Sequence, residues 1–267
     1  MKTNALPAEL IDSISAMRKV SLADLDEIRL LNRIDSKYAF HIRQLPALLR
    51  ALAPNYPLLE IDGRRIFRYE NDYFDTPEFL LYHMHHRGMA NRFKVRTRTY
   101  ADNGLRFFEV KYKTSSNRTL KTRALMPDLT LLPEALNGLD WRRQQPRLLG
   151  KVMQIGFSRI TLAGFSPPER ITLDLNLCFK NSSGEMHFPE LVIAELKQEK
   201  SSGQSVFLQQ LRKFHLEEIG FSKYALSVAL LEKVKYNAFK PVMLKLNRIL
   251  SLENKVTPAL LALKKTT

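Results

Sequence analysis

Charged side chains recur at every second position between residues 91 and 123, and this spacing is the part of the chain that most clearly indicates chemistry. The charges that alternate form three series, which are Arg92, Lys94, Arg96 and Arg98, then Glu109, Lys111 and Lys113, then Lys121 and Arg123. Alternate residues of an extended strand point to one face of a sheet, so each series predicts a row on a single face. Apolar residues such as Val95 and Val110 fill the intervening positions and predict a packed opposite face. So many cations on one face require an anion to neutralise them, and phosphate fits best.

The composition supports an anionic partner and a large core. The chain has 267 residues, 45% of them hydrophobic, and its 42 basic and 27 acidic residues give a net charge of +15. Such a charge is typical of proteins that bind nucleic acid, nucleotides, polyphosphate or an anionic membrane surface. The only cysteine is Cys178, so no internal disulfide framework is expected, and no run of 18 apolar residues predicts a membrane-spanning helix. We therefore expect a cytoplasmic protein, with peripheral contact to the inner face of a membrane left open.

The common nucleotide-binding motifs do not occur in this chain. Neither the P-loop pattern GxxxxGK[ST] nor the dinucleotide-binding pattern GxGxxG is found. If the protein handles nucleotides, it must therefore hold their phosphates with side chains rather than with a glycine-rich loop.

The periodicity of the sequence predicts an α+β fold built on one antiparallel sheet. Strands are expected at 33–40, 64–75, the three basic segments, 157–163, 170–179 and 191–197, and helices at 5–31, 204–219 and 222–236. A sheet with a charged inner face must enclose a ligand-binding space, so we predict a closed antiparallel β-barrel with flanking and plugging helices. We expect an N-terminal helical segment over 1–29, a barrel domain over 30–236 and a basic tail over 237–267.

An ordered set of motifs gives this pattern a family resemblance. The motifs are RxDxKY (33–38), YxxxYFDTPxxxxY (69–82), NRxKxRxRxY (91–100), ExKxK (109–113), KxR (121–123), RxxxDxNL (170–177), ExK (195–197) and FSKY (221–224). Their order, over roughly residues 30–232, resembles the VTC domain, the polyphosphate polymerase branch of the triphosphate tunnel metalloenzymes, or CYTH-like proteins. The resemblance implies a closed antiparallel β-barrel whose tunnel binds the triphosphate of a nucleotide together with Mn²⁺ or Mg²⁺.

The resemblance also implies an activity, which is ATP-dependent transfer of a terminal phosphoryl group onto a growing polyphosphate chain. The expected partners are ATP or another nucleoside triphosphate and inorganic polyphosphate or triphosphate, with no specific nucleic acid. A membrane-protein partner and the oligomeric state stay open. Two other functions also stay open, namely hydrolysis of inorganic or nucleoside triphosphates and non-catalytic binding of polyphosphate or nucleic acid. Glu109 and Glu195 favour a metal–nucleotide site, because a carboxylate on a nucleic-acid surface repels phosphate.

The resemblance assigns roles to individual residues. The catalytic and phosphate-binding positions correspond here to Lys37, Arg96, Arg98, Lys113, Lys121, Arg159, Arg170 and Lys223. Further basic positions expected to contact the bound phosphates are Arg33, Arg92, Lys94, Lys111, Arg123 and Lys197. Glu195 corresponds to the glutamate that holds the metal, and Asp35 and Glu109 are the other expected metal ligands. A carboxylate among cations stays ionised and offers the oxygen ligands that hard cations prefer.

The first strand departs from the pattern of the wider superfamily, which opens with two acids and a lysine at alternate positions. Arg33 replaces the first acid, and Asp35 and Lys37 remain. This departure favours the VTC branch over the simple triphosphatases, and it puts a full carboxylate cage for the metal in doubt.

Ion pairing within the sheet is a competing explanation for two of the acids. Glu195 is two residues from Lys197, and Asp174 is four residues from Arg170. The segment around Glu195 is otherwise apolar, which favours an interior role for this carboxylate over a surface ion pair.

Overall fold

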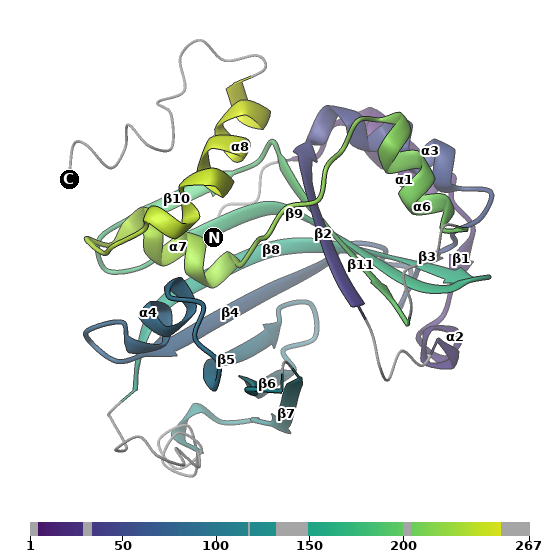
Figure 1. Ribbon diagram of the computed structural model, residues 1–267. Helices are drawn as coiled ribbons and strands as arrows, with labels where there is room; N and C mark the ends of the chain where they lie inside the picture. The colour runs from purple at the N-terminus through teal and green to yellow at the C-terminus, as the bar shows by residue number, and fades with distance from the viewer. Residues whose placement is uncertain (1–4, 29–33, 117, 132–148, 200–203, 252–267) are drawn as a thin grey trace.

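The computed structural model describes residues 5–28, 34–116, 118–131, 149–199 and 204–251 (Figure 1). The strands are β1 (Lys19–Val20), β2 (Ile34–His41), β3 (Leu58–Leu59), β4 (Phe67–Asp75), β5 (Arg92–Tyr100), β6 (Arg106–Lys113), β7 (Thr119–Leu125), β8 (Gly150–Phe165), β9 (Pro168–Lys180), β10 (Glu185–Phe188) and β11 (Leu191–Gln198). The helices are α1 (Ala8–Ser15), α2 (Leu22–Glu27), α3 (Leu45–Leu52), α4 (Leu80–His86), α6 (Val206–Lys213), α7 (Lys223–Leu231) and α8 (Lys240–Ser251), with 3₁₀ turns η1 (Ile42–Gln44), η2 (Leu129–Leu131) and η3 (Asn237–Phe239). These elements confirm the predicted α+β class.

One sheet of 11 strands organises the molecule. Its main path runs β2–β11–β9–β8–β4–β5–β6–β7, and all neighbours on this path are antiparallel, as predicted. The short β3 pairs with β8 and, in parallel, with β1, while β10 pairs with β9. Between β5 and β6 the polar turn contains Gly104 at φ 73°, a left-handed conformation that glycine adopts without strain.

The structure corrects the prediction of a closed barrel. In the described part of the chain, β2 and β7 end the main path and do not pair with each other. The facing charges give a physical reason, because Lys37 on β2 and Lys121 and Arg123 on β7 belong to the cationic rows. Like charges on two strands oppose their close approach. The sheet is therefore an open trough, and we call the face that carries these rows the inner face.

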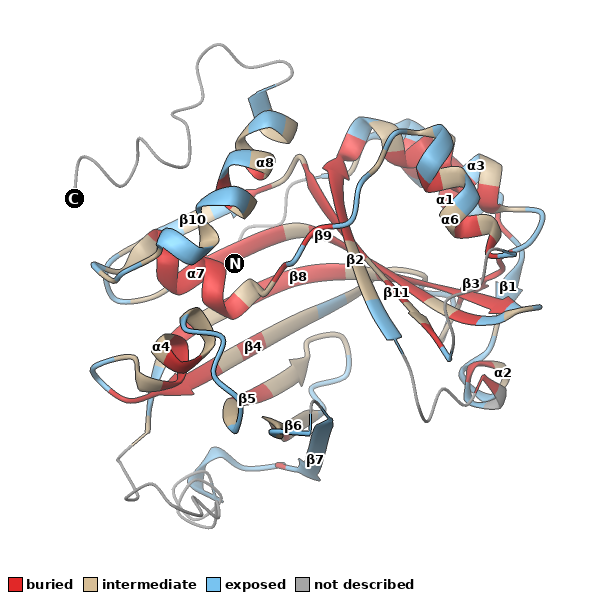
Figure 2. Ribbon diagram, viewed as in Figure 1, coloured by how far each residue is buried: buried red, intermediate tan, exposed pale blue. Residues whose placement is uncertain are grey.

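Three helices cover the outer face of β2, β11, β9 and β8. Helices α1, α3 and α6 pack there around one hydrophobic cluster, and the red bands in Figure 2 mark their buried sides. The spacing of the sequence explains this packing for α3, whose Leu45, Leu48, Leu49 and Leu52 recur at helical intervals and are fully buried. This packing supports the four strands on the face opposite the charged rows.

Two further helices, α7 and α8, pack against apolar residues on the inner face of β4, β8 and β9. Helix α7 is buried on nearly all sides and shares a hydrophobic cluster with α8, to which Met243 and Leu246 contribute. Ser222 caps α7 by accepting a hydrogen bond from the backbone N–H of Ala225 at 3.3 Å. The first turn of α7 is therefore fixed beside the charged rows. In the parts of the chain that the structure describes, none of the helices has the length and apolar character needed to span a membrane.

Candidate functional site

The strand register brings the predicted basic rows together on the inner face. Arg96 of β5 lies opposite Glu109 of β6, which in turn lies opposite Arg123 of β7. The same register sets Lys94, Lys111 and Lys121 in a second row and Arg92 beside Lys113 in a third. Directly opposite residues of an antiparallel pair share a face, so the alternation seen in the sequence becomes one continuous charged surface.

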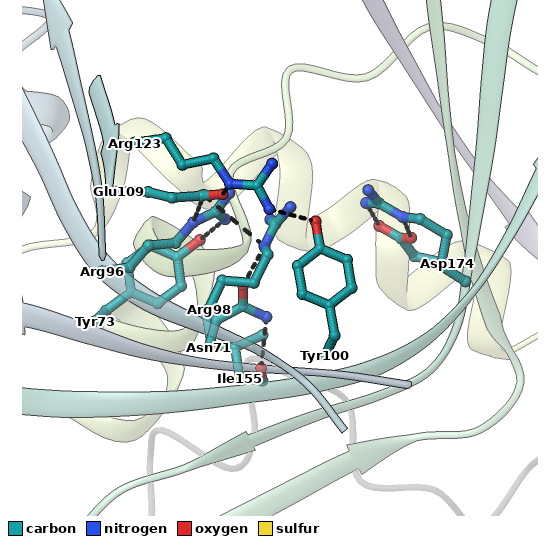
Figure 3. Close-up of polar contacts among 10 residues, drawn as sticks. Asn71, Tyr73, Arg96, Arg98, Tyr100, Glu109, Arg123, Ile155 and Asp174 are labelled. Carbon is teal, nitrogen blue, oxygen red and sulfur yellow. Dashed lines mark hydrogen bonds and ion pairs between the residues drawn. The ribbon is translucent and has the colours of Figure 1, made fainter. Parts of the chain in front are cut away.

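Glu109 is the centre of a cluster of arginines (Figure 3). Its Oε2 accepts hydrogen bonds from Arg96 Nε at 2.8 Å and Arg96 Nη2 at 2.5 Å. Arg98 Nε lies 3.9 Å from the same oxygen, and Arg123 Nε lies 3.7 Å from Oε1. Burial alone would raise the pKa of Glu109, but the charges of Arg96 and Arg98 lower it, so the carboxylate stays ionised.

Uncharged side chains fix Arg96 and Arg98, and the sequence analysis did not identify these side chains as site residues. Tyr73 Oη accepts a hydrogen bond from Arg96 Nη1 at 2.9 Å, and Asn71 Oδ1 accepts one from Arg98 Nε at 3.0 Å. Asn71 is fully buried and is itself held by its Nδ2, which donates to the carbonyl of Ile155 at 3.1 Å. Asn71 and Tyr73 are two residues apart in β4, which pairs with β5, so their alternation could have placed both side chains on the inner face.

Asp174 of β9 forms a second cluster and corrects one expected pairing. Arg159 holds it with two hydrogen bonds of 2.6 and 2.9 Å, and Lys223 Nζ of α7 lies 2.5 Å from Oδ2. Burial disfavours the charged form of Asp174, yet the charges of Arg159 and Lys223 outweigh it and lower the pKa to about 2. Arg170, the partner considered from the sequence, instead donates from Nη2 to the carbonyl of Leu25 in α2 at 2.5 Å.

A third cluster lies at the other side of the trough, where acids and lysines alternate on β11 and β2. Glu195 lies opposite Lys37, and Lys197 lies opposite Asp35. Lys197 Nζ is 3.1 Å and Lys37 Nζ is 3.9 Å from the Glu195 carboxylate. Burial alone would raise the pKa of Glu195, but the charges of Lys197 and Lys37 hold it well below its usual range. Glu195 thus does pair with Lys197, and it does so inside the charged surface.

The two sides of the trough approach closely enough to influence each other. Lys111 on β6 and Glu195 on β11 are separated in the sheet by β9, β8, β4 and β5, yet the charge of Glu195 raises the pKa of Lys111. Burial and nearby cations outweigh this effect and lower that pKa to about 6. Lys94, which donates to Ser222 Oγ at 3.0 Å, has a pKa of about 7 because of burial and the charge of Lys37 on β2. The sheet therefore curls until strands distant along its path face one another.

The remaining predicted residues lie at the margins of this surface. Lys121, Arg123 and Asp35 are exposed, while Arg92 and Lys113 are half-buried, and Arg92 Nη1 donates to the carbonyl of Met89 at 2.5 Å. Arg33 lies outside the described residues. The catalytic and binding roles of all these residues remain predictions.

A buried carboxylate on β4 ties the helices to the site. Asp75 accepts hydrogen bonds from the backbone N–H groups of Thr76, Leu81 and Tyr82 at 2.7, 2.8 and 2.9 Å. It also accepts a short hydrogen bond from the hydroxyl of Tyr224 in the first turn of α7. One side chain thus joins β4, the start of α4 and the end of α7 that faces the charged rows.

The predicted metal ligands are not gathered into one group. Asp35 and Glu195 are on neighbouring strands, whereas Glu109 is on β6 and is engaged by arginines. Within the described residues, the one group of three potential metal-binding side chains is Cys178, Glu185 and His187, on β9 and β10. The inner face therefore offers carboxylates singly or in pairs, each among cations.

Comparisons with known proteins give a family match over most of the chain. The family model of the VTC domain matches residues 32–232. No protein of curated function matches the chain. Among solved structures, a candidate adenylate cyclase from Vibrio parahaemolyticus is similar, with 14% identity, a TM-score of 0.45 and coverage of 73% of this chain and 99% of that one.

Two further solved structures resemble the chain to a similar degree. A candidate adenylyl cyclase from Hippeastrum, whose structure is described as revealing a dominant triphosphatase activity, has 15% identity, a TM-score of 0.47 and coverage of 74% and 95%. A protein of Pyrococcus horikoshii has 14% identity, a TM-score of 0.42 and coverage of 73% and 96%. The family match from residue 32 to residue 232 includes every strand of the main sheet path, from β2 to β11. The chain therefore belongs to the VTC domain family.

Proposed function

We propose that this protein is a phosphotransferase that moves the terminal phosphoryl group of ATP onto a growing polyphosphate chain, with Mn²⁺ or Mg²⁺ as the metal. In this proposal the inner face of the trough binds the triphosphate and the end of the polyphosphate chain. The observation that carries the proposal is an excess of half-buried basic side chains there, since the acids already have cationic partners and two more lysines have no acid beside them.

The ion pairs of the inner face show this excess of basic side chains. Glu109, Asp174 and Glu195 each have at least two cations within 4.0 Å. Among the described residues, no acid lies within ion-pair distance of Lys94 or Lys111, and the pKa values of these lysines fall to about 7 and about 6. An anion of several charges would restore their protonated forms, because it supplies the counter-charge that the protein lacks.

Phosphoryl transfer makes use of such a surface. Charge spreads over the equatorial oxygens of the transferred group in the transition state, and catalysis consists mainly of positioning and electrostatic stabilisation. A guanidinium holds two phosphate oxygens at once, while an ammonium acts as a compact charge. We assign the first role to Arg96, Arg98 and Arg159, and the second to Lys37, Lys94, Lys111, Lys197 and Lys223.

The carboxylates suit a metal ion that arrives with the nucleotide. Mg²⁺ is usually held by one or two carboxylates together with substrate phosphates and water. Glu195 fits this description, because its two partners are lysines at 3.1 and 3.9 Å, its pKa is low, and 20% of its side chain is exposed. We propose that Glu195, assisted by Asp35, holds the metal, which would neutralise developing charge on the phosphates.

A product assay tests the proposed function. Purified protein is incubated with ATP, Mn²⁺ and a short polyphosphate primer, and the products are resolved on a gel. Long anionic chains that a polyphosphatase degrades would support the polymerase. Free phosphate without longer chains would replace it with a hydrolase, and unchanged ATP would leave a binding protein. Arg98→Ala should lower product formation, while Arg68→Ala, on the opposite face of β4 with 55% of its side chain exposed, serves as the matched control.

A further inference from the structure

A hairpin outside the charged trough places three different metal-binding side chains together. Strands β9 and β10 bring Cys178, Glu185 and His187 to one spot, and their ligand atoms lie within 4.8 Å of one another. We propose that these three residues form a separate site for a borderline-soft divalent cation such as Zn²⁺. The proposal does not depend on the activity assigned to the inner face.

The register of the hairpin explains why the three side chains meet. His187 lies directly opposite Cys178, and Glu185 is two residues before His187, so all three share one face. The connecting turn is fixed by Asn181, whose Oδ1 accepts hydrogen bonds from the backbone N–H groups of Ser183 and Gly184 at 2.9 and 3.0 Å. The donors therefore stand on paired strands joined by an ordered turn, which suits a preorganised metal site.

The distances agree with a tetrahedral ion after small side-chain adjustments. Cys178 Sγ lies 3.3 Å from Glu185 Oε1 and 3.8 Å from His187 Nε2, and Nε2 lies 2.7 Å from Oε1. Zinc bonds of about 2.3 Å to sulfur and about 2.0–2.1 Å to nitrogen place neighbouring ligand atoms roughly 3.3–3.6 Å apart. An ion would therefore need only to part the imidazole and the carboxylate, which now bond to each other. Binding would replace the thiol proton, so one proton is released to solvent.

The surroundings indicate what kind of ion and what kind of site this is. A thiolate with an imidazole selects Zn²⁺ or Co²⁺ over the Mg²⁺ and Mn²⁺ that prefer oxygen ligands. Lys180 Nζ approaches the other carboxylate oxygen, Glu185 Oε2, at 3.5 Å and leaves Oε1 directed at the cysteine and the histidine. Cys178 is 2% exposed, but the side chains of Glu185 and His187 are 31% and 42% exposed. Three protein ligands with one side open to water describe an exchangeable site rather than a closed structural one.

A bulge in β9 separates this site from the inner face. Two residues of β9, Asn176 and Leu177, lie opposite the single Phe157 of β8, and Asn176 adopts φ 50°. An extra residue in a strand reverses the direction of every side chain that follows it. Cys178 therefore points away from the face that Asp174 shares with the cationic rows, although only four residues separate them.

Cobalt binding tests the proposal directly. The reduced, chelator-treated protein is titrated with Co²⁺, and its absorption spectrum is recorded. We expect one equivalent to bind, with a thiolate-to-cobalt charge-transfer band in the near ultraviolet that Zn²⁺ then removes by displacement. Cys178→Ser should lose this band, and His187→Gln should weaken Co²⁺ binding by at least about tenfold. Zn²⁺ should raise the melting temperature of the wild-type protein and leave that of Cys178→Ser unchanged.

Two controls keep the test decisive. Glu195→Gln, altered at the proposed metal carboxylate of the inner face, should retain the charge-transfer band, because the two sites share no ligand. His187 is partly exposed, so His187→Gln should fold even if the buried Cys178→Ser substitution does not, and circular dichroism checks both. Absence of a thiolate band in the wild type at saturating Co²⁺, or unchanged Co²⁺ affinity in His187→Gln, would overturn the proposal.

Discussion

The two sides of the trough neutralise their acids in different ways. On β5, β6 and β7, Glu109 is surrounded by Arg96, Arg98 and Arg123, a group that we call the arginine wall. On β2 and β11, Glu195 is accompanied by Lys37 and Lys197, which we call the lysine wall. Each wall thus contains a central carboxylate held by cations, but the cations differ in chemistry.

The difference suggests a division of labour within the proposed reaction. In the arginine wall, the guanidinium groups of Arg96 and Arg98 are fixed by Tyr73 and Asn71, so they are already oriented before phosphate binds. The nearest ammonium lies 3.1 Å from the Glu195 carboxylate, whereas the nearest guanidinium nitrogen lies 2.5 Å from that of Glu109, so we expect Glu195 to exchange an ammonium for a metal ion more readily. We therefore expect the arginine wall to bind phosphate with or without metal, and the lysine wall to make turnover depend on metal.

The largest expected effect comes from removing the charge of the lysine-wall carboxylate. Glu195→Gln keeps the shape of the side chain and loses the negative ligand, so we expect metal-dependent turnover of ATP to fall by roughly 10²–10³-fold. Affinity for tripolyphosphate without metal should stay equal or rise, because the trough becomes more positive. Product release and calorimetry measure the two quantities. Glu217→Gln, at a side chain that is 78% exposed, is the matched control. Full turnover in Glu195→Gln would contradict the division between the walls.

A smaller effect is expected when one guanidinium of the arginine wall is replaced by an ammonium, which keeps the charge. Arg96→Lys should weaken tripolyphosphate binding by about tenfold, both with and without Mn²⁺, because an ammonium cannot hold two oxygens at once. Calorimetry in the presence and absence of metal measures this directly, and Arg68→Lys is the control on the opposite face. A loss confined to the metal-containing titration would show that the arginine wall, too, works through the metal.

Stability should separate the paired cations from the unpaired ones. Lys111→Met removes a half-buried amine that has no acid within ion-pair distance and whose pKa is lowered to about 6, so the free protein should melt about 2–4 °C higher, equivalent to about 1 kcal/mol. Arg96→Met should instead lower the melting temperature, because Glu109 loses its closest partner. Thermal unfolding without ligand measures both. A lower melting temperature in Lys111→Met would mean that this lysine is a structural partner rather than a binding group.

Stability should also depend on pH. In the folded protein Lys111 and Lys94 have pKa values of about 6 and about 7, while lysines of the unfolded chain stay protonated to about pH 10. The unfolded state therefore binds more protons across this window, and stability without ligand should rise from about pH 6 to about pH 9. Affinity for tripolyphosphate should change in the opposite direction, because the lysines lose charge.

Denaturant unfolding at several pH values measures this slope. Lys111→Met should show a shallower rise than the wild-type protein, since one of the two titrating lysines is gone. Equal slopes in the two proteins would remove Lys111 as a source of the pH dependence.

The alternation of charged and apolar residues was enough to predict the basic rows of this site. The contacts between distant segments could not be predicted from it. The series from Arg92 to Arg98 became a row because a strand has a period of two, a property visible in any single segment. The partners of Asp174 were not predictable in this way, because Arg159 belongs to a paired strand and Lys223 to a helix 49 residues further along the chain. Asn71 was missed because the alternation that places an uncharged residue on the inner face does not identify the arginine it contacts. Whether the sheet closes depends on β2 and β7, and no local pattern records the distance between them.

The bulge at Asn176 has a consequence for how this chain tolerates change. Successive side chains of a strand alternate between its two faces, so one additional residue exchanges the faces of the residues that follow it. Deleting residue 176 would leave Leu177 opposite Phe157 and Cys178 opposite Gly156, so β9 would become regular and Leu177 and Phe179 would keep their places in the hydrophobic cluster they share with α7. Deleting a residue elsewhere in β9 would instead exchange the faces of its neighbours, because no extra residue is present there to be lost. The bulge is thus the position in β9 at which one residue can be lost without exchanging the two faces, and other insertions or deletions are expected in the connecting turns.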